Sequence, residues 1–461
     1  MASASRLGSS LRLLSQQASA LVGPSTASRT LTTSAIASAA AKKPASVKKK
    51  AVVKKKATHS GPRSSGGRRK GGADSTTGLS KTSEFHVDAP DMSHLPFLHA
   101  ESLTSTSAGQ TFAFSDQTLA AFKAFGLPQE LERDLASQPK PRSLVRQQTL
   151  DLLDKLDAAS KGKKGLSVVL DGQRGSGKST LLAQSIAYAL DDGWVVVSVP
   201  RAINLVNSST MYSYSAGHKA YLQPEATKAL LEATLKVNGG ALKGIKTTVA
   251  VDVDGSKVEA GTSLEALLKR GIDEAASASA RQTILETLFT TLATQTEVPV
   301  LIAVDDAQAL FRTSLYKDPD FINLESFELG LPRALLTLLT TPTLTRGAII
   351  SALSTTHTEF PTPPELTLAL SPSTRPITQA INAYTKLHPQ HLEHARLAAK
   401  YAEKIDTSQP LSRSEAAAIF AQLKDERRHW SAVNDELFME KLVESNGNAR
   451  IFSRSLVSTL L

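Results

Sequence analysis

The chain has 461 residues, a formal net charge of +10 and no cysteine. The lack of cysteine excludes disulfide frameworks, thiolate metal sites and cysteine-based catalysis. The charge is uneven: residues 1–73 contain 15 lysines and arginines and no acid, whereas the remainder contains 38 basic and 43 acidic residues. The folded part is therefore slightly acidic, and the basic character belongs to the N-terminal segment.

Residues 1–38 have the composition of a mitochondrial presequence. They are rich in Ser, Ala, Leu and Thr, and they contain Arg6, Arg12 and Arg29 but no acid. The alternative is a disordered N-terminus with chance arginines. No apolar run is long enough to cross a bilayer or to form a secretory signal. We therefore expect a protein of the mitochondrial matrix without a membrane span.

Residues 39–82 form a basic tail with clusters KK, KKK, KKK and RRK set among Ala, Ser and Gly. Such a segment cannot bury a core, so we expect it to be disordered. Its functional interpretation is a contact to RNA phosphates, and the alternative is a solvated linker. Residues 83–137 are interpreted as an N-terminal extension that wraps the main domain.

A glycine-rich loop at 172–179 (GQRGSGKS) fits the phosphate-binding pattern GxxxxGK[ST] at every fixed position. An apolar strand is predicted before it at 166–170, and a helix after it at 180–190. Gly172, Gly175 and Gly177 would let backbone N–H groups surround a phosphate at the start of that helix. Lys178 would reach the outer phosphates, and the Ser179 hydroxyl would hold Mg²⁺. The alternative is a glycine-rich turn that binds nothing.

Strands and helices alternate through the region that we assign to a nucleotide-binding domain, residues 138–371. A helix over 142–156 is predicted to begin it, and Asp254-Gly255 marks a hairpin inserted at 247–259. Continuous apolar strands between helices indicate a parallel sheet covered on both faces. The further strands are predicted at 194–199, 298–304, 347–353 and 365–370, and the further helices at 224–235, 263–275, 280–294 and 332–339.

A second motif, VPVLIAVDD, ends the strand predicted at 298–304 in two acids. Ligands bind at the carboxyl edge of such sheets. Asp305 is expected to hold Mg²⁺, and Asp306 to polarise an attacking water. Asp306 is one methylene shorter than the glutamate usual in ATPases of this type, which weakens a hydrolytic role. Ser354 follows the next strand, where it would either sense the outer phosphate or cap the strand end.

The segment 372–461 is predicted to be a helical lid domain, with helices at 376–387, 391–405, 412–423 and 435–445 and a final helix that runs to the C-terminus. Ser412 and Glu415 fit a capping box for one of them. Arg450 is predicted to approach the phosphates from this lid. His391 and His394 lie three residues apart, but no further side chain completes a metal set, so we interpret them as surface residues.

The combination resembles the death-associated protein family of mitochondrial small-subunit ribosomal GTP-binding proteins. The resemblance covers roughly residues 85–461, through GQRGSGKS, LIAVDD at 301–306, LVR ending at Arg146, and SNGNAR at 445–450. It implies an α/β, AAA-like P-loop NTPase core and a bound GTP or GDP with Mg²⁺, ATP being possible. The phosphate and metal residues that it implies are Gly172, Gly175, Ser176, Gly177, Lys178, Ser179, Thr180 and Asp305.

The resemblance also implies a structural subunit of the mitochondrial small ribosomal subunit, in its head. Its partners would be ribosomal proteins and rRNA, with contacts toward the large subunit and no homo-oligomeric ring. The residues leave two alternatives open. One is an active mitochondrial AAA-like ATPase that remodels protein or nucleic acid, and the other is a scaffold with a relict loop and no nucleotide. GTP and ATP are not distinguished, because no NKxD or TKxD motif is present.

Overall fold

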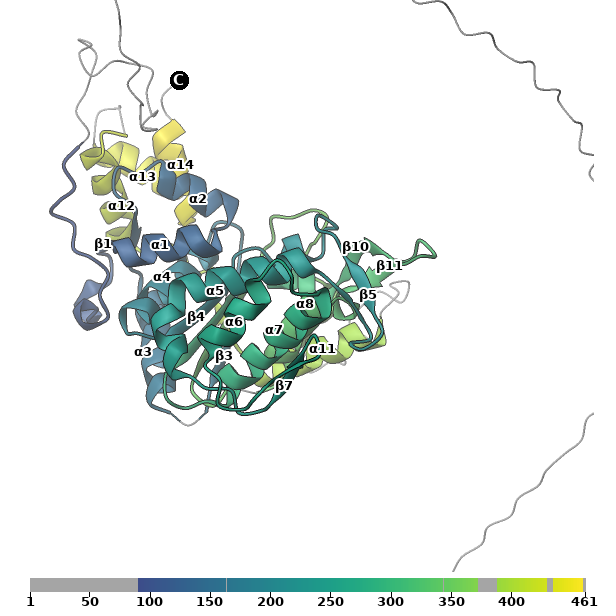
Figure 1. The fold of residues 1–461 in the computed structure, drawn as a ribbon. Helices are drawn as coiled ribbons and strands as arrows, with labels where there is room; N and C mark the ends of the chain where they lie inside the picture. The colour runs from purple at the N-terminus through teal and green to yellow at the C-terminus, as the bar shows by residue number, and fades with distance from the viewer. Residues whose placement is uncertain (1–89, 163, 343, 372–387, 429–433, 459–461) are drawn as a thin grey trace, which may run out of the picture. The chain divides into compact units, whose positions relative to one another are not determined.

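Five parallel strands form the central sheet of this computed structural model (Figure 1). The structure describes residues 90–162, 164–342, 344–371, 388–428 and 434–458. The predicted presequence (1–38), basic tail (39–82) and helix at 376–387 lie outside the described residues. In order across the sheet, the strands are β13 (Glu403–Asp406), β3 (Leu166–Asp171), β12 (Gly347–Ala352), β9 (Val300–Val304) and β4 (Val195–Val199).

Four of the strands, β3, β12, β9 and β4, are mostly apolar because both faces of the sheet are covered there. In β4, Val195 and Val197 join one core cluster, whereas Val196 between them joins the cluster on the opposite face. Ile302 and Leu301 of β9 divide in the same way. The period of two residues assigns alternate side chains to the two faces, so the predicted parallel sheet covered on both faces is confirmed.

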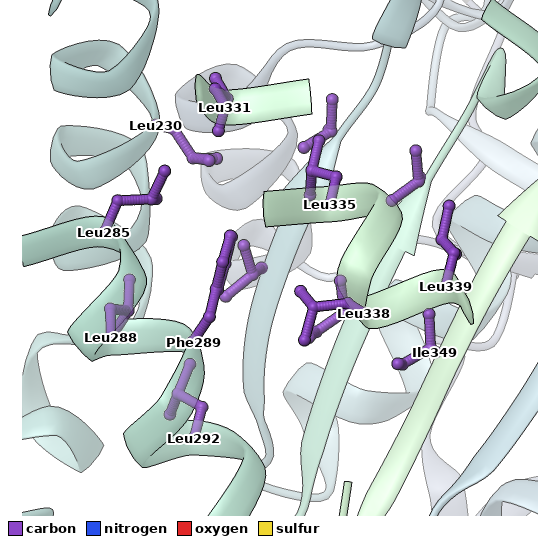
Figure 2. Packing of buried hydrophobic residues seen from close by; sticks show 14 of the residues in the cluster. Leu230, Leu285, Leu288, Phe289, Leu292, Leu331, Leu335, Leu338, Leu339 and Ile349 are labelled. Carbon is purple, nitrogen blue, oxygen red and sulfur yellow. The ribbon is translucent and has the colours of Figure 1, made fainter. Parts of the chain in front are cut away.

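Helices fill both layers. Figure 2 shows Leu285, Leu288 and Phe289 of one helix facing Leu335 and Leu338 of another beside the sheet. The layer that contains this packing is formed by α5 (Pro224–Gly244), α6 (Leu264–Ile272), α7 (Ala278–Thr294), α8 (Gly330–Thr340) and α11 (Pro389–Tyr401). The opposite layer is formed by α1 (Asp116–Phe125), α3 (Gln147–Lys161) and α4 (Lys178–Asp191).

The prediction of a strand at 365–370 is wrong, because this segment forms the short helix α9 (Pro364–Ala369). Its alternating apolar pattern is compatible with either structure, and Pro364 at the first turn favours a helix. The fifth strand is β13, which pairs in parallel with β3. It was predicted as the end of the helix at 391–405, which in fact stops at Tyr401. One of the two edge strands of the sheet thus comes from the segment predicted to be a helical lid domain.

Four two-stranded antiparallel sheets accompany the central one among the described residues. The inserted hairpin is confirmed, and its turn has Asp254 and Gly255 at φ 52° and 76°, as a tight hairpin turn requires. The strands of these small sheets are β1 (Thr111–Ala113) with β2 (Arg142–Leu144), β5 (Ser213–Ser215) with β6 (Ala220–Leu222), β7 (Val251–Val253) with β8 (Ser256–Val258), and β10 (Thr313–Lys317) with β11 (Asn323–Glu325).

A separate small core holds the C-terminal helices together, with Phe438, Phe452 and Leu456 among its buried side chains. Its helices are α12 (Arg413–Asp425), α13 (Asp435–Glu444) and α14 (Ala449–Ser458). The predicted Ser412–Glu415 capping box begins α12. Upstream, Phe112 and Phe122 of the N-terminal extension pack into the main core, and α2 (Gln129–Ala136) follows.

Five short 3-10 helices complete the described chain: η1 (Ala100–Ser102), η2 (Ser105–Ser107), η3 (Ala202–Leu205), η4 (Ala307–Phe311) and η5 (Ser326–Glu328). Within the described ranges, none of the helices combines the length and the apolar composition that crossing a membrane requires.

Candidate functional site

The glycine loop connects the end of β3 to the start of α4, as the sequence predicts. Gly177 has a φ of 101°, and a β-carbon built there would meet no atom within 4 Å. Gly175 has a φ of 79°, and its β-carbon would lie 2.7 Å from Oδ1 of Asn448 and 2.8 Å from Cβ of Arg450. One glycine therefore borders open space, and the other permits close approach of the C-terminal helices.

Lys178 is the first residue of α4, and it is only 8% exposed. Its ammonium group donates to the carbonyl oxygens of Gly172 (2.6 Å) and Gln173 (2.9 Å). Burial lowers the pKa of Lys178, and the negative charges of Asp171, Asp305 and Asp406 oppose that shift. Lys178 thus places a buried positive charge beside the loop, held by two backbone carbonyls.

Asp305 lies at the carboxyl end of β9 and is 2% exposed. Its Oδ1 accepts a hydrogen bond of 2.8 Å from the backbone N–H of Asp306, whereas Oδ2 is buried without a hydrogen-bond partner in the described part of the chain. Burial and the neighbouring Asp306 raise the pKa of Asp305 to about 7, and a hydrogen bond from Ser179 opposes the rise. Ser179 and Asp305, each predicted to hold Mg²⁺, thus lie close together in the structure.

Asp306 adopts the left-handed backbone conformation (φ 56°), which is rare outside glycine. Burial raises the pKa of its carboxyl group, and His357 and Ser354 oppose that rise. Its Oδ2 lies 3.6 Å from Nε2 of His357. Ser354 follows β12, the strand that separates β3 from β9, so it stands between the glycine loop and the two acids. His357 was not predicted from the sequence.

Thr407 and Ser408, which follow β13, form hydrogen bonds to the glycine loop and the end of β3. Neither residue was predicted to belong to the site. Thr407 Oγ1 shares a hydrogen bond of 2.7 Å with the Ser176 hydroxyl and donates to the carbonyl oxygen of Asp171 (3.0 Å). Ser408 accepts from the N–H of Gln173 (3.1 Å). The Ser176 side chain therefore anchors the loop to β13.

The C-terminal helices approach the loop through the segment that precedes α14. Asn448 donates from its amide to the carbonyl oxygen of Arg174 at 2.8 Å. Arg450 forms an ion pair with Glu130 of α2, and its Nε and Nη2 are buried without hydrogen-bond partners in the described structure. Arg450 therefore lies beside the loop, where its backbone N–H donates to the carbonyl oxygen of Gly175 (3.4 Å) and its side chain pairs with Glu130.

Arg146 joins the loop to α12. Its guanidinium group donates to the carbonyl oxygens of Ser176 (3.5 Å), Gln409 (3.0 Å) and Pro410 (3.2 Å). It also lies 3.4 Å from a carboxylate oxygen of Glu415. Arg146 belongs to the LVR motif, but its partners Gln409, Pro410 and Glu415 lie more than 260 residues away, so no local pattern could predict them.

These elements enclose a cavity of about 710 Å³, which is within the range of small-molecule sites. Gly172 is not in its wall; a β-carbon built at Gly172 would lie 2.6 Å from Oγ1 of Thr407, on the side toward β13. Arg201 and His357 were not predicted and do line it. The other predicted site residues line it: Gly175, Ser176, Gly177, Lys178, Ser179, Thr180, Asp305, Asp306, Ser354 and Arg450.

A model of the family described as mitochondrial ribosomal death-associated protein 3 matches residues 143–455. The chain belongs to this family. The match includes the glycine loop, Asp305 and Arg450, and it confirms the family resemblance. The family's mitochondrial description agrees with the mitochondrial location predicted from residues 1–38.

Two fungal proteins named small ribosomal subunit protein mS29 are similar to this chain. The protein from Neurospora crassa is 27% identical over 237 residues, which cover 50% of this chain and 49% of the relative. The protein from Schizosaccharomyces pombe is 27% identical over 220 residues, which cover 47% of this chain and 46% of the relative. The chain thus spans about half the length of the curated relatives that it matches.

Proposed function

We propose that this chain is a structural constituent of the small subunit of the mitochondrial ribosome, in the matrix, and that it holds a purine nucleotide with Mg²⁺ in the cavity beside the glycine loop. The nucleotide is GTP or GDP, with ATP as the alternative. The observation that carries the nucleotide site is the convergence of Lys178, Ser179 and Asp305 on one cavity. Family membership and the two mS29 relatives support the ribosomal role.

The donors present fit a Mg²⁺–phosphate group. The orphaned Oδ2 of Asp305 lies in a wall that it shares with the Ser179 hydroxyl, and oxygen ligands of these kinds suit Mg²⁺. The described residues contain no cluster of three His, Cys, Asp or Glu side chains that could hold an ion. A metal held here would therefore take its remaining ligands from phosphate and water, which is the usual arrangement for Mg²⁺.

The remaining roles follow from charge and space. Lys178 supplies a buried positive charge, and the open side of Gly177 leaves room for phosphate oxygens next to the first N–H groups of α4. Arg450, with two unpartnered buried nitrogens, supplies further donors from α14. Bound Mg²⁺ would neutralise phosphate charge and would offset the electrostatic cost of burying the carboxylates of Asp305 and Asp306 next to each other.

We infer that the nucleotide acts as a structural ligand and that its hydrolysis is slow or absent. The cavity wall combines the loop with α12 and α14, so a ligand there would hold together segments far apart in the chain. Asp306 is engaged by His357 and Ser354, which restrains it as a base for an attacking water. The competing proposal is an active AAA-like ATPase.

The proposed partners are the proteins and rRNA of the small subunit, with contacts toward the large subunit. The basic tail, residues 39–82, supplies the charge for the RNA contacts. We expect no homo-oligomeric ring.

Sedimentation of the tagged full chain with purified mitochondrial ribosomes tests the ribosomal role. We expect the chain to sediment with the small subunit and not with the large subunit alone.

Acid extraction of the purified chain followed by chromatography identifies the bound nucleotide. We expect about one purine nucleotide per chain, and much less in Lys178→Ala. Steady-state turnover near one per second, an ordinary enzyme rate, would favour the ATPase. A folded chain without nucleotide would favour the scaffold.

A further inference from the structure

The hairpins β5–β6 and β10–β11 lie beside each other (Figure 1). Large apolar side chains are exposed on these hairpins and in the segments next to their strands. Phe321 is 80% exposed and Met211 is 76% exposed. Isolated exposed apolar residues are ordinary, but a gathered set marks an interaction site. We call this set the paired-hairpin surface; its members are Met211, Tyr212, Tyr214, Leu315, Phe321 and Ile322.

The two hairpins form one unit because Tyr212 bridges them. Its hydroxyl donates to the carbonyl oxygen of Lys317 at 2.6 Å, and its ring meets the ring of Tyr316 edge-on at 4.8 Å. Tyr316 is fully buried beneath, and its hydroxyl is hydrogen-bonded to Thr210 (2.7 Å). The exposed side chains therefore stand on a packed base, which lowers the entropy cost of binding through them.

The β10–β11 loop holds its apolar tip in a conformation that costs energy. Phe321 has a φ of 63°, which is exceptional for a bulky residue. The loop is fixed by Asp318, whose Oδ1 accepts from the N–H groups of Asp320 (3.0 Å) and Ile322 (2.8 Å). The backbone N–H of Asp318 also donates to the carbonyl oxygen of Ile322 (2.9 Å). Burial within the chain does not explain this arrangement, since the ring points its surface to solvent.

The charge around Phe321 identifies the kind of partner. The loop sequence 317–323, KDPDFIN, places two acids and one base beside the exposed ring. Phosphates of RNA would be repelled by Asp318 and Asp320. A second copy that docked through the same surface about a two-fold axis would bring these acids together. The part of the basic tail that carries its lysine and arginine clusters, residues 42–70, contains no Phe, Tyr, Trp, Leu, Ile or Met residue with which to bury the ring.

We propose that the paired-hairpin surface is the docking site for another protein, one with an apolar pocket for Phe321 and lysine or arginine side chains at its rim. Aromatic anchors of this kind are frequent energetic centres of protein interfaces, and complementary charge at the rim guides association. The proposal does not depend on the nucleotide site, which lies at the carboxyl edge of the central sheet.

Photo-crosslinking tests the proposal in intact mitochondria. The full chain carries p-benzoylphenylalanine at position 321, and the control carries it at Val249, which is 61% exposed near the β7–β8 hairpin. After irradiation we expect one discrete protein adduct from position 321, resistant to nuclease, and no such adduct from position 249. A nuclease-sensitive adduct, an adduct of the chain with itself, or no adduct would overturn the proposal.

A charge reversal tests the basic rim. Asp320→Lys, which lies beside the anchor, is expected to reduce the adduct at position 321 at least about tenfold through like-charge repulsion. The matched control is Glu259→Lys, an exposed acid next to the β7–β8 hairpin. Melting curves of both variants verify folding. An adduct whose yield is unchanged by Asp320→Lys would exclude a basic partner and refute the proposal.

Discussion

The side-chain amide of Asn448 donates a hydrogen bond of 2.8 Å to the carbonyl oxygen of Arg174 in the glycine loop. The same side chain accepts from the N–H groups of Arg450 (3.2 Å) and Ile451 (3.3 Å) through its Oδ1. Asn448 therefore caps the first turn of α14 with one end and holds the loop with the other. The packing of the C-terminal helices and the shape of the loop are coupled through this one residue.

The two roles of Asn448 can be separated by substitution. Asn448→Asp keeps an oxygen for the helix cap but loses the donor to Arg174, whereas Asn448→Ala loses both. We expect Asn448→Ala to lower the free energy of unfolding by about 1–2 kcal/mol, and Asn448→Asp by less. Both variants should bind nucleotide more weakly in equilibrium titrations. Unchanged affinity in both would show that the loop does not need this contact.

Gly177 and Gly193 form a matched pair for testing the cavity. Both have positive φ (101° and 72°), and a β-carbon at either would meet no atom within 4 Å. Alanine at each should cost about 1–2 kcal/mol of stability through backbone strain alone. Only Gly177 borders the cavity, so only Gly177→Ala should reduce the nucleotide retained on purification, at least about tenfold. Equal retention by both variants would argue against a phosphate beside Gly177.

Asp305 makes a specific prediction about pH. Its pKa is raised to about 7 in the folded chain, above the ordinary value of 3.8. Between these values the folded state keeps a proton that the unfolded state has lost. The stabilisation that the folded state gains from this proton is therefore fully present below pH 4 and is lost as the pH rises through 7. Without Mg²⁺ and nucleotide, we expect Asp305→Asn to remove this loss, on the order of 4 kcal/mol at pH 8.

Chemical denaturation of both proteins from pH 4 to pH 8 measures this difference, with the exposed Asp320→Asn as the control. Added Mg²⁺ and nucleotide should stabilise the wild type and leave Asp305→Asn nearly unchanged, because the ion needs the carboxylate. A wild type that gains stability relative to Asp305→Asn as the pH rises, in the absence of ligand, would contradict the prediction.

A buried ion pair joins β2 to the end of α12. The side chains of Arg142 and Glu426 are 4% and 0% exposed, and Arg428 lies 3.5 Å from the second oxygen of Glu426. Burial, with a smaller contribution from Arg428, lowers the pKa of Arg142 to about 10. Removing Arg142 alone leaves a buried carboxylate that only the more exposed Arg428 can compensate.

We expect Arg142→Met to cost about 3–5 kcal/mol of stability, and Arg142→Met combined with Glu426→Leu to recover most of it. Urea denaturation of the single and double variants measures both effects. The exposed pair Lys161–Asp157 on α3 is the control; Lys161→Met should change stability by no more than about 0.5 kcal/mol. A double variant as unstable as the single one would show that the pair is needed for more than charge balance.

Much of the central fold could be predicted because its signals are local. The strands that become β3, β4, β9 and β12 are short apolar runs, and burial on both faces leaves few other uses for such runs. β13 could not be found in this way. Its residues Glu403–Asp406 are exposed or half-buried and contain one apolar residue, Ile405, so they form no apolar run. The other edge strand, β4, is buried at every position and could be predicted. The prediction for the segment 365–370 failed because its alternating apolar residues are compatible with both a strand and a helix.

The sequence alone determined three features: the glycine loop at 172–179, the two acids that follow the strand at 298–304, and the lysines and arginines near the N-terminus. These features depend on backbone geometry and composition within a few neighbouring residues. Only the tertiary structure decided that Thr407 supports Ser176, that Arg146 reaches Gln409, and that Glu130 faces Arg450. Such contacts join positions hundreds of residues apart, and their geometry exists only once the sheet and the C-terminal helices have packed.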